Sequence, residues 1–320
     1  MKPLSSRRAI LAACLAAASA LAYGQSNKPI TLIVPFPAGG ATDQLARAVA
    51  EKLTEQKGYN VIVDNKPGAG AQVAVNNLKL APADGNTLFI GDIGAFSLNR
   101  HLYSKLSYDT EKDLQPITLV GKAPLFMVVP MNSPYKTAQE LMAAAKKQDM
   151  SYGSPGVGTI AHVGPEIMRA RMGLKITHIP YRGSSPALVD LASGQVPFLM
   201  DPLASSTPFL KDNRIRILAV ATPTRTKLMP QVPTLAESGA EGIHFSAWFG
   251  ISGKAGMPAE LVRKYSKDIG DVISAPEMVK RFADLGIEMS PTSPEGFAQF
   301  IKAEADAYGP VIKSLNISLD

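Results

Sequence analysis

The chain has 320 residues, of which 46% are hydrophobic and 19% are charged, and its formal net charge is +6 at pH 7. Its basic residues are scattered along the sequence instead of forming a patch interleaved with aromatic residues, which argues against a nucleic-acid-binding protein. After residue 24 no stretch approaches the roughly 18 apolar residues that a membrane-spanning helix needs. We therefore expect a globular protein without a nucleic-acid partner.

Residues 1–22 have the layout of a bacterial secretory signal peptide. Lys2, Arg7 and Arg8 precede an apolar run over 9–18, and small residues follow it. We expect cleavage near Ala22 and a periplasmic protein, with Sec and twin-arginine export both left open. The +6 includes the three leader charges, so the mature chain would carry +3.

The only cysteine, Cys14, falls within this leader. A lipoprotein cleavage box at 11–14 is the alternative, but only about five apolar residues precede Cys14, too few for such a signal. Cleavage near Ala22 leaves about 298 residues without a thiol. Such a chain must be held by a sizeable core, and its length suffices for two ordinary domains.

Strands and helices alternate along the first part of the mature chain. Short apolar runs predict strands at 30–34, 61–63, 88–90 and 117–120. A helical spacing of apolar residues begins at Asp43. Continuous apolar strands separated by helices indicate a mostly parallel sheet covered on both faces.

The alternation then restarts. The expected strands are 125–129, 150–152, 176–179, 197–200 and 215–220, with helices at 138–147, 159–172 and 186–193. After Trp248 the chain turns helical at 258–273, 276–285 and 294–315, and each of these helices has a proline near its first turn.

Two α/β units follow from this order. We expect domain 1 over residues 23–121 plus 250–320, with the C-terminal helices, and domain 2 over 122–249. The strand runs at 117–129 and 245–251 would carry the chain between the units. Two crossover strands make a hinge and open a ligand cleft between the carboxyl ends of two sheets.

The sharpest local motif is the glycine-rich loop 151–159, between a strand and a helix. Its glycines let the backbone approach a ligand closely, and the amides of the following helix favour an anion. Ser154, Gly158 and Thr159 are candidate ligand-binding residues, and His162 lies one turn into the helix. The alternative is a tight turn with Thr159 as a plain N-cap.

Two further loops follow strands of the first unit. The loop 35–43 contains the candidate residues Phe36, Pro37, Ala38, Gly39, Gly40 and Asp43. Asp43 is also expected to cap a helix, which is compatible with anion binding. In the loop 91–95, Asp92 is either a turn residue or an acceptor in the pocket.

Catalytic and cofactor motifs are weak. The run 156–161 matches a dinucleotide-binding Gly-x-Gly-x-x-Ala, but no acidic residue follows the next strand to bind a ribose. Ser154 is not in a Gly-x-Ser-x-Gly motif, because Tyr152 occupies the first glycine position. The four histidines lie far apart. We expect no catalytic residues, no cofactor and no metal site, and the alternative is an exported α/β hydrolase-like enzyme that uses Ser154 or His162.

The loop Ile33–Asp43 resembles the first loop of the Bug, or TctC-like, solute-binding proteins of tripartite tricarboxylate transporters. The other similar stretches are 64–70, 83–88, 153–162, 178–184, 219–222, 232–237 and 247–250. The resemblance covers essentially the whole mature chain in order.

This resemblance implies a two-domain periplasmic binding protein fold of the type II kind, which closes on a small carboxylate. A dicarboxylate, an amino acid and an aromatic carboxylate all suit such a cleft. The ligand would pass to a membrane permease without reaction, and the protein would be a monomer. The ligand-binding residues carried over are Phe36 to Gly40, Asp43, Ser154, Gly158, Thr159 and His162.

Two departures from the family pattern fall at candidate site residues. Asp92 stands where members commonly have Thr or Ser, which disfavours a second anion there. Met200-Asp201-Pro202 replaces the usual Phe-Asp-Asn, so the floor of the cleft, with Asp201, is expected to differ.

Overall fold

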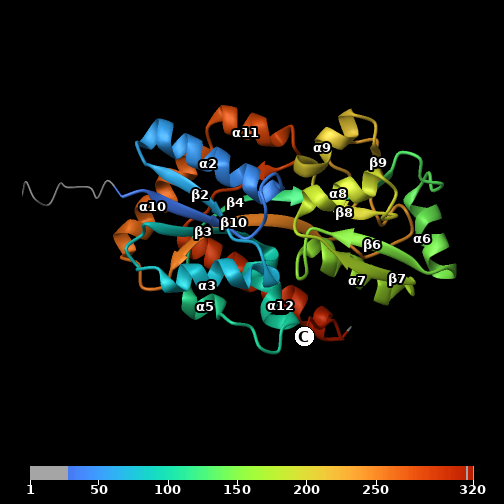
Figure 1. The fold of residues 1–320 in the computed structure, drawn as a ribbon, viewed down its shortest axis with the longest axis horizontal. Coiled ribbons are helices and arrows are strands. Elements are labelled where there is room, and N and C mark those ends of the chain that lie inside the picture. Colours follow the sequence, from blue (N-terminus) through green and yellow to red (C-terminus); the bar gives the residue numbers. More distant parts are fainter. Residues whose placement is uncertain (1–27, 315, 320) are drawn as a thin grey trace, which may run out of the picture.

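The computed structural model describes residues 28–314 and 316–319, so the predicted signal peptide over 1–22 lies outside the described residues. The chain forms two α/β units that lie side by side along the longest axis of the molecule (Figure 1). One unit contains a six-stranded sheet and the other a five-stranded sheet, which confirms the predicted fold class. None of the helices in the described part of the chain is long and apolar enough to span a membrane.

The larger sheet has the order β11-β4-β10-β3-β1-β2. Its strands are β1 (Ile30–Val34), β2 (Val61–Asn65), β3 (Thr87–Asp92), β4 (Leu114–Pro124), β10 (Ser246–Lys254) and β11 (Glu288–Met289). The predicted parallel pairing holds for β2, β1 and β3. It is wrong for the other half of the sheet, where β10 runs antiparallel to β3 and β4, because β10 enters from the far unit.

The helices of this unit lie around that sheet. They are α2 (Ala41–Lys57), α3 (Gln72–Leu80), α4 (Asn99–Leu102), α5 (Thr110–Asp113), α10 (Ala259–Ile273), α11 (Pro276–Ala283) and α12 (Pro294–Ser314). A 3-10 turn over Ala69–Ala71 precedes α3, and a π-helical turn over Gly94–Leu98 follows β3. The three C-terminal helices, α10, α11 and α12, each begin within one residue of their predicted starts.

The smaller sheet has the order β7-β6-β8-β5-β9. Its strands are β5 (Phe126–Pro130), β6 (Met150–Ser154), β7 (Ile176–Pro180), β8 (Leu199–Asp201) and β9 (Ile215–Val220). Its helices are α6 (Ala138–Lys147), α7 (Ile160–Met172), α8 (Ser184–Ala192) and α9 (Leu203–Lys211). The strands β7, β6 and β8 are parallel, and β5 is antiparallel to β8 and β9.

The chain passes between the two sheets twice. It leaves through β4, which is followed after Leu125 by β5, and it returns into β10. The predicted domain boundaries at 121 and 250 fall within β4 and β10 and stay a prediction.

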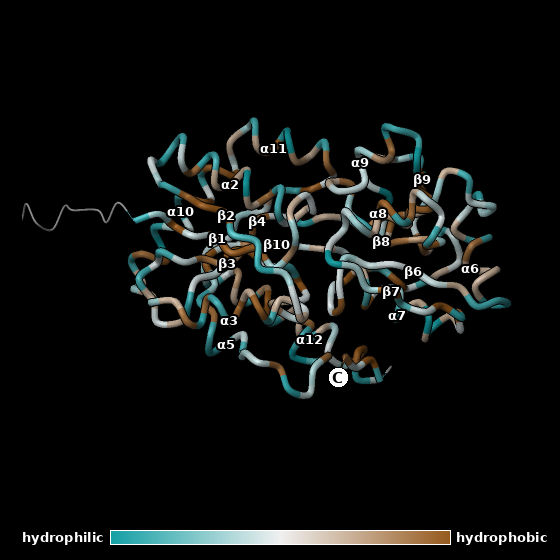
Figure 2. The backbone as a smooth tube through the Cα atoms, in the orientation of Figure 1, coloured by the Kyte–Doolittle hydropathy of each residue, from teal (hydrophilic) through white to brown (hydrophobic). Residues whose placement is uncertain are grey.

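Hydrophobic residues gather on the strands inside each unit, and the exposed faces of the helices are hydrophilic (Figure 2). In the larger unit the centre of the core is aromatic. Phe96 stacks on Trp248 with ring centroids 5.9 Å apart, and Phe297 meets both rings edge-on. Burying side chains of this size contributes most of the hydrophobic stabilisation, so α12 is held firmly against β10.

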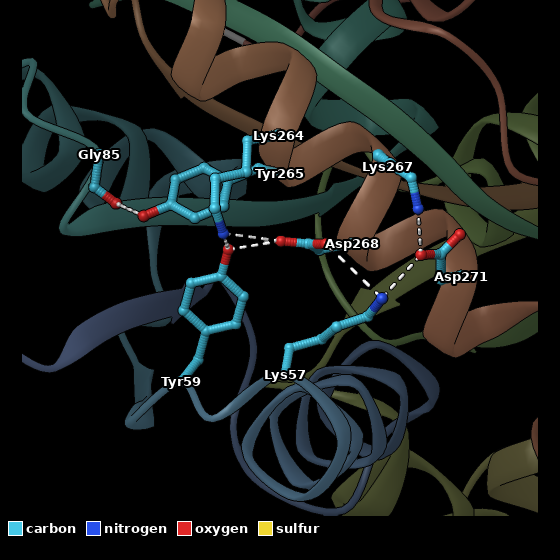
Figure 3. A network of polar contacts seen from close by, with 8 residues as sticks. All are labelled: Lys57, Tyr59, Gly85, Lys264, Tyr265, Lys267, Asp268 and Asp271. Atoms are coloured by element: carbon cyan, nitrogen blue, oxygen red, sulfur yellow. Dashed lines mark hydrogen bonds and ion pairs between the residues drawn. The ribbon is translucent and has the colours of Figure 1, made fainter. Parts of the chain in front are cut away.

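A polar network joins α10 to the end of α2 and to the loop before β3 (Figure 3). The Tyr59 hydroxyl donates to Asp268 Oδ2 at 2.6 Å, and Lys57 Nζ lies 2.7 Å from Asp271 Oδ2. The Tyr265 hydroxyl donates to the Gly85 carbonyl at 3.1 Å. These contacts bring a helix near the C-terminus of the chain onto the N-terminal elements of the same unit.

Candidate functional site

Two cavities lie between the units and share Phe36 and Pro155 in their walls. The inner cavity has a volume of about 50 Å³. The outer cavity has a volume of about 630 Å³ and is lined by the loop 67–71, by Tyr103 and Tyr181, and by Arg182 at its rim. Both units contribute to both walls, so a ligand in either cavity would touch both.

The inner cavity is where four helices begin. Gly40, Ala41 and Thr42 at the start of α2 line it, as do Thr159, Ile160 and Ala161 at the start of α7. Ser184, the first residue of α8, and Pro202, the N-cap of α9, complete this set. The first amides of a helix have no acceptor within it, and the aligned peptide dipoles make this end positive.

The remaining walls of the inner cavity are largely apolar. Leu125, Ala247 and Phe249 come from the segments that connect the units, and Asp92 comes from the end of β3. No lysine or arginine stands among the described residues that line it. Recognition of an anion here would therefore depend on helix amides and on the Thr42 hydroxyl, because the Thr159 hydroxyl donates to the Gly156 carbonyl and the Ser184 hydroxyl donates to Asp201.

The first predicted loop is partly in the site. Phe36 lines both cavities, Pro37 lines the outer one, and Gly40 lines the inner one. Ala38 and Gly39 are exposed and line neither cavity. Helix α2 begins at Ala41 with Gly40 as its N-cap, so Asp43 stands in the first turn and not at the cap.

Asp43 holds this loop in place. It is 2% exposed, and its Oδ2 accepts hydrogen bonds from the Gly39 amide at 2.9 Å and from Arg47 Nε at 3.0 Å. Asn65 Nδ2 donates both to Asp43 Oδ1 and to the Phe36 carbonyl. Burial disfavours the ionised carboxylate, but these hydrogen bonds outweigh burial and lower the pKa of Asp43.

The glycine-rich loop after β6 is also held by its own side chains. Ser154 is fully buried, and its Oγ lies 2.7 Å from His178 Nε2. Thr159 Oγ1 donates to the Gly156 carbonyl at 2.8 Å. Thr159 lines the inner cavity, whereas Ser154 and Gly158 line neither cavity.

His162 faces the interior of its unit. Its Nδ1 accepts the Gly158 amide at 3.3 Å, and its ring stacks on His178 with centroids 3.9 Å apart. Burial lowers the pKa of His162 to about 4, and burial together with His162 lowers the pKa of His178 to about 3. Both rings are therefore neutral at pH 7, and His162 supports the loop from behind.

The two other candidate aspartates differ in their surroundings. Asp92 is 7% exposed and lines the inner cavity, and its Oδ1 accepts the Ala95 amide at 3.2 Å. Asp201 is 1% exposed and lies behind Ser184, accepting hydrogen bonds from the hydroxyls of Ser184, Ser205 and Ser206. Burial raises the pKa of each carboxyl to about 6, although hydrogen bonds oppose this effect.

The sequence prediction missed Ser184, Leu125, Ala247 and Phe249, whereas it placed Pro202, next to Asp201, in the floor of the cleft. The signal for Ser184 was present, because Arg182-Gly183-Ser184 follows a strand and opens a helix just as the two predicted loops do. Leu125 and Phe249 give no such local signal, since each is an apolar residue in an apolar run. Among the described residues no cluster of three or more His, Cys, Asp or Glu could hold a metal ion.

The sequence matches the profile of the "Tripartite tricarboxylate transporter family receptor" over residues 45–317. It is 33% identical over 289 residues to a UPF0065 protein from the tcbD–tcbE intergenic region of Pseudomonas sp. strain P51, covering 89% of this chain and 86% of the relative. It is 29% identical over 295 residues to protein BugT of Bordetella pertussis, covering 91% and 90% of the two chains.

Solved structures agree. Rpa4515 of R. palustris with adipate superposes with a TM-score of 0.89 at 31% identity, covering 92% of this chain and 100% of that one. The periplasmic binding protein BugD gives 0.86 at 28% identity, covering 91% and 99%. MatC of Rhodopseudomonas palustris with bound malate gives 0.84 at 26% identity, covering 89% and 98%.

A fold of two α/β units with a cavity between them, at which helices from both units begin, is the fold of the periplasmic binding proteins that this chain resembles. This chain belongs to the TctC family of tripartite tricarboxylate transporter receptors, which includes the Bug proteins. The family is one of receptors of tripartite tricarboxylate transporters, and BugD is a periplasmic binding protein.

Proposed function

We propose that this protein captures a small carboxylate in the inner cavity and delivers it, unaltered, to the permease subunits of a tripartite tricarboxylate-type transporter. The observation that carries this proposal is the meeting of four helix N-termini, from both units, at one small cavity. Helix N-termini stabilise negative charge through free amides and through the dipole. The proposal is supported by two similar structures whose ligands are adipate and malate.

In this proposal the ligand occupies both cavities. A volume of about 50 Å³ has room for roughly four water-sized atoms, which matches a carboxylate with its neighbouring carbon. The rest of the ligand extends past Phe36 and Pro155 into the outer cavity. Candidate contacts are the amides of Ala41, Thr42, Ile160 and Ala161 and the hydroxyl of Thr42.

The remaining predicted residues take supporting roles in this proposal. Asp43, Ser154 and His162 hold their loops in shape, and Asp201 orients Ser184. The domain assignment of 23–121 plus 250–320 and of 122–249 is proposed with it. The hinge then lies in the two segments around Leu125 and Ala247, at the wall of the ligand cavity itself.

The experiment is isothermal titration calorimetry of the purified protein without its leader against a panel of aliphatic dicarboxylates, amino acids and aromatic carboxylates. We expect at least one carboxylate to bind with a stoichiometry of one per chain, and the matching primary amide to bind at least about tenfold more weakly because it lacks the charge. Equal binding of acid and amide would contradict the proposal.

One contact favours a second candidate, an exported hydrolase. Ser154 Oγ and His178 Nε2 are 2.7 Å apart, which is the separation of a nucleophile and its base. However, Ser154 is fully buried, also donates to the Gly156 carbonyl, and lines neither cavity. Proton NMR of the carboxylate that binds, after prolonged incubation with the protein, distinguishes the two candidates. An unchanged spectrum supports binding without reaction, and new resonances that disappear in Ser154→Ala support the hydrolase.

A further inference from the structure

Asp92 has a position that differs from those of the other buried carboxylates near the site. It ends β3 and lines the inner cavity, into which the helices α2, α7, α8 and α9 also direct their N-termini. The hydrogen bonds to its side chain come from the backbone: the Ala95 amide donates to Oδ1, and the amides of Gly94 and of Asp92 itself also favour the ionised carboxylate. None of the ion pairs in the described part of the chain includes Asp92.

Asp43 and Asp201 differ from Asp92 in the groups that donate hydrogen bonds to their carboxylates. Asp43 accepts hydrogen bonds from Arg47, Asn65 and the Gly39 amide. Asp201 accepts hydrogen bonds from three serine hydroxyls. Neither of these carboxylates lines the inner cavity, and each is satisfied within its own unit. A buried carboxylate is costly unless it is paired, and Asp92 is the one of the three that has only backbone donors and also faces the ligand cavity.

We propose that Asp92 accepts a hydrogen bond from an ammonium group of the ligand, and that the protein therefore selects an amino-substituted carboxylate over the unsubstituted acid. This inference rests on the proposed function. The helix N-termini bind the carboxylate of such a zwitterion, and Asp92 on the same cavity wall binds its positive end. The cavity thus presents positive helix N-termini and one negative carboxylate, which suits a ligand that carries both charges.

The charges decide which ligand fits. An unsubstituted carboxylate would bring a second negative charge close to Asp92 inside a buried cavity, where electrostatic interactions are much stronger than in water. An adjacent ammonium group removes this repulsion and forms a charge-assisted hydrogen bond. A hydroxyl donates a hydrogen bond without compensating the charge, so a hydroxy acid should rank between the two.

The test uses trios that differ only in one substituent. Succinate, malate and aspartate share one carbon skeleton; glutarate, 2-hydroxyglutarate and glutamate share the next; propanoate, lactate and alanine provide monocarboxylates. Calorimetry at pH 7.5 gives the affinities for the wild type, Asp92→Asn and Asp92→Thr. Asp284→Asn, at a surface carboxyl that is 67% exposed, is the matched control.

We expect the amino acid of the best-binding trio to bind at least about tenfold more tightly than the unsubstituted acid, with the hydroxy acid between them. In Asp92→Asn and Asp92→Thr the differences in affinity among the three ligands should largely disappear, mainly because the unsubstituted acid binds more tightly. Asp284→Asn should keep the wild-type order. Circular dichroism and melting temperature establish that both Asp92 variants are folded.

Three results would overturn the inference. The first is an unsubstituted acid that binds the wild type as tightly as the corresponding amino acid does. The second is an affinity difference within the trio that is as large in Asp92→Asn as in the wild type. The third is proton uptake: one proton bound with each succinate, measured in buffers of different ionisation enthalpy, would mean that Asp92 pairs with a proton. All three leave the proposed function intact, whereas failure of every carboxylate to bind would overturn both.

Discussion

Asp43 illustrates how a single buried carboxylate determines the shape of a binding loop. Its three donors come from the loop itself, from the next turn of α2 and from the end of β2. The loop thereby presents Phe36 and Gly40 to the cavities while Asp43 itself stays behind them. A residue that looks like a ligand contact in the sequence is here a residue that positions the contacts.

Asp43→Ala should therefore lower the free energy of unfolding by about 1.5–3 kcal/mol, because the Gly39 amide and the Asn65 side chain lose a charged acceptor that is itself buried. Arg47→Ala is the matched control. The Arg47 side chain is 52% exposed, so its ion pair should contribute only about 0–1 kcal/mol. Urea denaturation of both variants measures the difference. Equal losses would show that the ion pair, and not the loop, carries the effect of Asp43.

The stacked pair His162 and His178 predicts a pH dependence with a definite sign. An unfolded histidine has a pKa of about 6.5, whereas burial lowers the pKa of His162 to about 4 and that of His178 to about 3. The unfolded state binds protons first as the pH falls, so this contribution to stability is present above pH 6.5 and is lost towards pH 4.

His162→Gln removes one titrating ring and keeps an acceptor for the Gly158 amide. Between pH 7 and 4.5 the wild type should lose about 1–3 kcal/mol more stability than this variant. Asp92 and Asp201 have raised pKa values and act in the opposite direction in both proteins, so they cancel in the comparison. The exposed His244, changed to Gln, is the control. Parallel pH profiles for the wild type and His162→Gln would contradict this prediction.

At the scale of elements, the start of a helix is the functional unit of this site. Ala41 is the first residue of α2, and Gly40 before it has an extended backbone with φ −78° and ψ 171°. Proline is accepted at a first helical position, and an extended preceding residue suits it. Ala41→Pro thus removes one amide hydrogen from the cavity wall and leaves the helix intact.

We expect Ala41→Pro to lower carboxylate affinity at least about tenfold, since a hydrogen bond to a charged group contributes about 1.5–3 kcal/mol. Ala259→Pro makes the same change at the first residue of α10, where the side chain is exposed and far from both cavities. Calorimetry should show a loss for the first variant only. Unchanged affinity in Ala41→Pro would move the anion away from α2.

The sequence predicted an element well where the spacing of its apolar residues agreed with the prolines and caps that mark its ends. The helix 138–147 was predicted with the bounds that α6 has, and prolines correctly marked the starts of α10, α11 and α12. Helix α9 was missed because Pro208 interrupts its pattern, and the π-helical turn after β3 has no periodic signal. The direction of β10 depends on the path of the chain between the units, which no local pattern encodes.

The same limit applies to the site. Loops that follow strands identified Phe36, Gly40, Asp92 and Thr159, which all line the inner cavity. The sequence could not distinguish them from Asp43, Ser154, His162 and Asp201, which lie one layer behind. Whether a polar side chain faces the cavity or its own loop depends on tertiary hydrogen bonds, and residue type alone does not reveal these.

At the scale of the whole molecule, glycines allow the two units to approach each other. Gly94 follows β3 in the larger unit, and a Cβ there would lie 2.7 Å from the Gly158 carbonyl oxygen of the smaller unit. Gln44 Nε2 donates to the Ala204 carbonyl across the same division at 3.1 Å. A ligand that touches both units stabilises this arrangement by its differential affinity for it.

Gly94→Ala should leave the protein folded, because Gly94 lies in a helical turn and has no positive φ. It should prevent the close contact with Gly158, lower ligand affinity about tenfold and abolish the ligand-induced decrease in radius of gyration. Gly270→Ala is the control, since its Cβ would have its nearest neighbour at 3.7 Å and Gly270 lines neither cavity. Small-angle scattering with and without the best carboxylate tests this. If the radius of gyration of Gly94→Ala decreases with ligand as much as that of the wild type, the units do not close at this point.

The most direct test of the central claim is a crystal structure of the protein with the carboxylate that binds most tightly in the panel. We expect the carboxylate oxygens to occupy the inner cavity, within hydrogen-bond distance of amides at the starts of α2 and α7, with the rest of the ligand passing Phe36 into the outer cavity. A carboxylate bound in the outer cavity alone, or held chiefly by the Arg182 side chain, would contradict it.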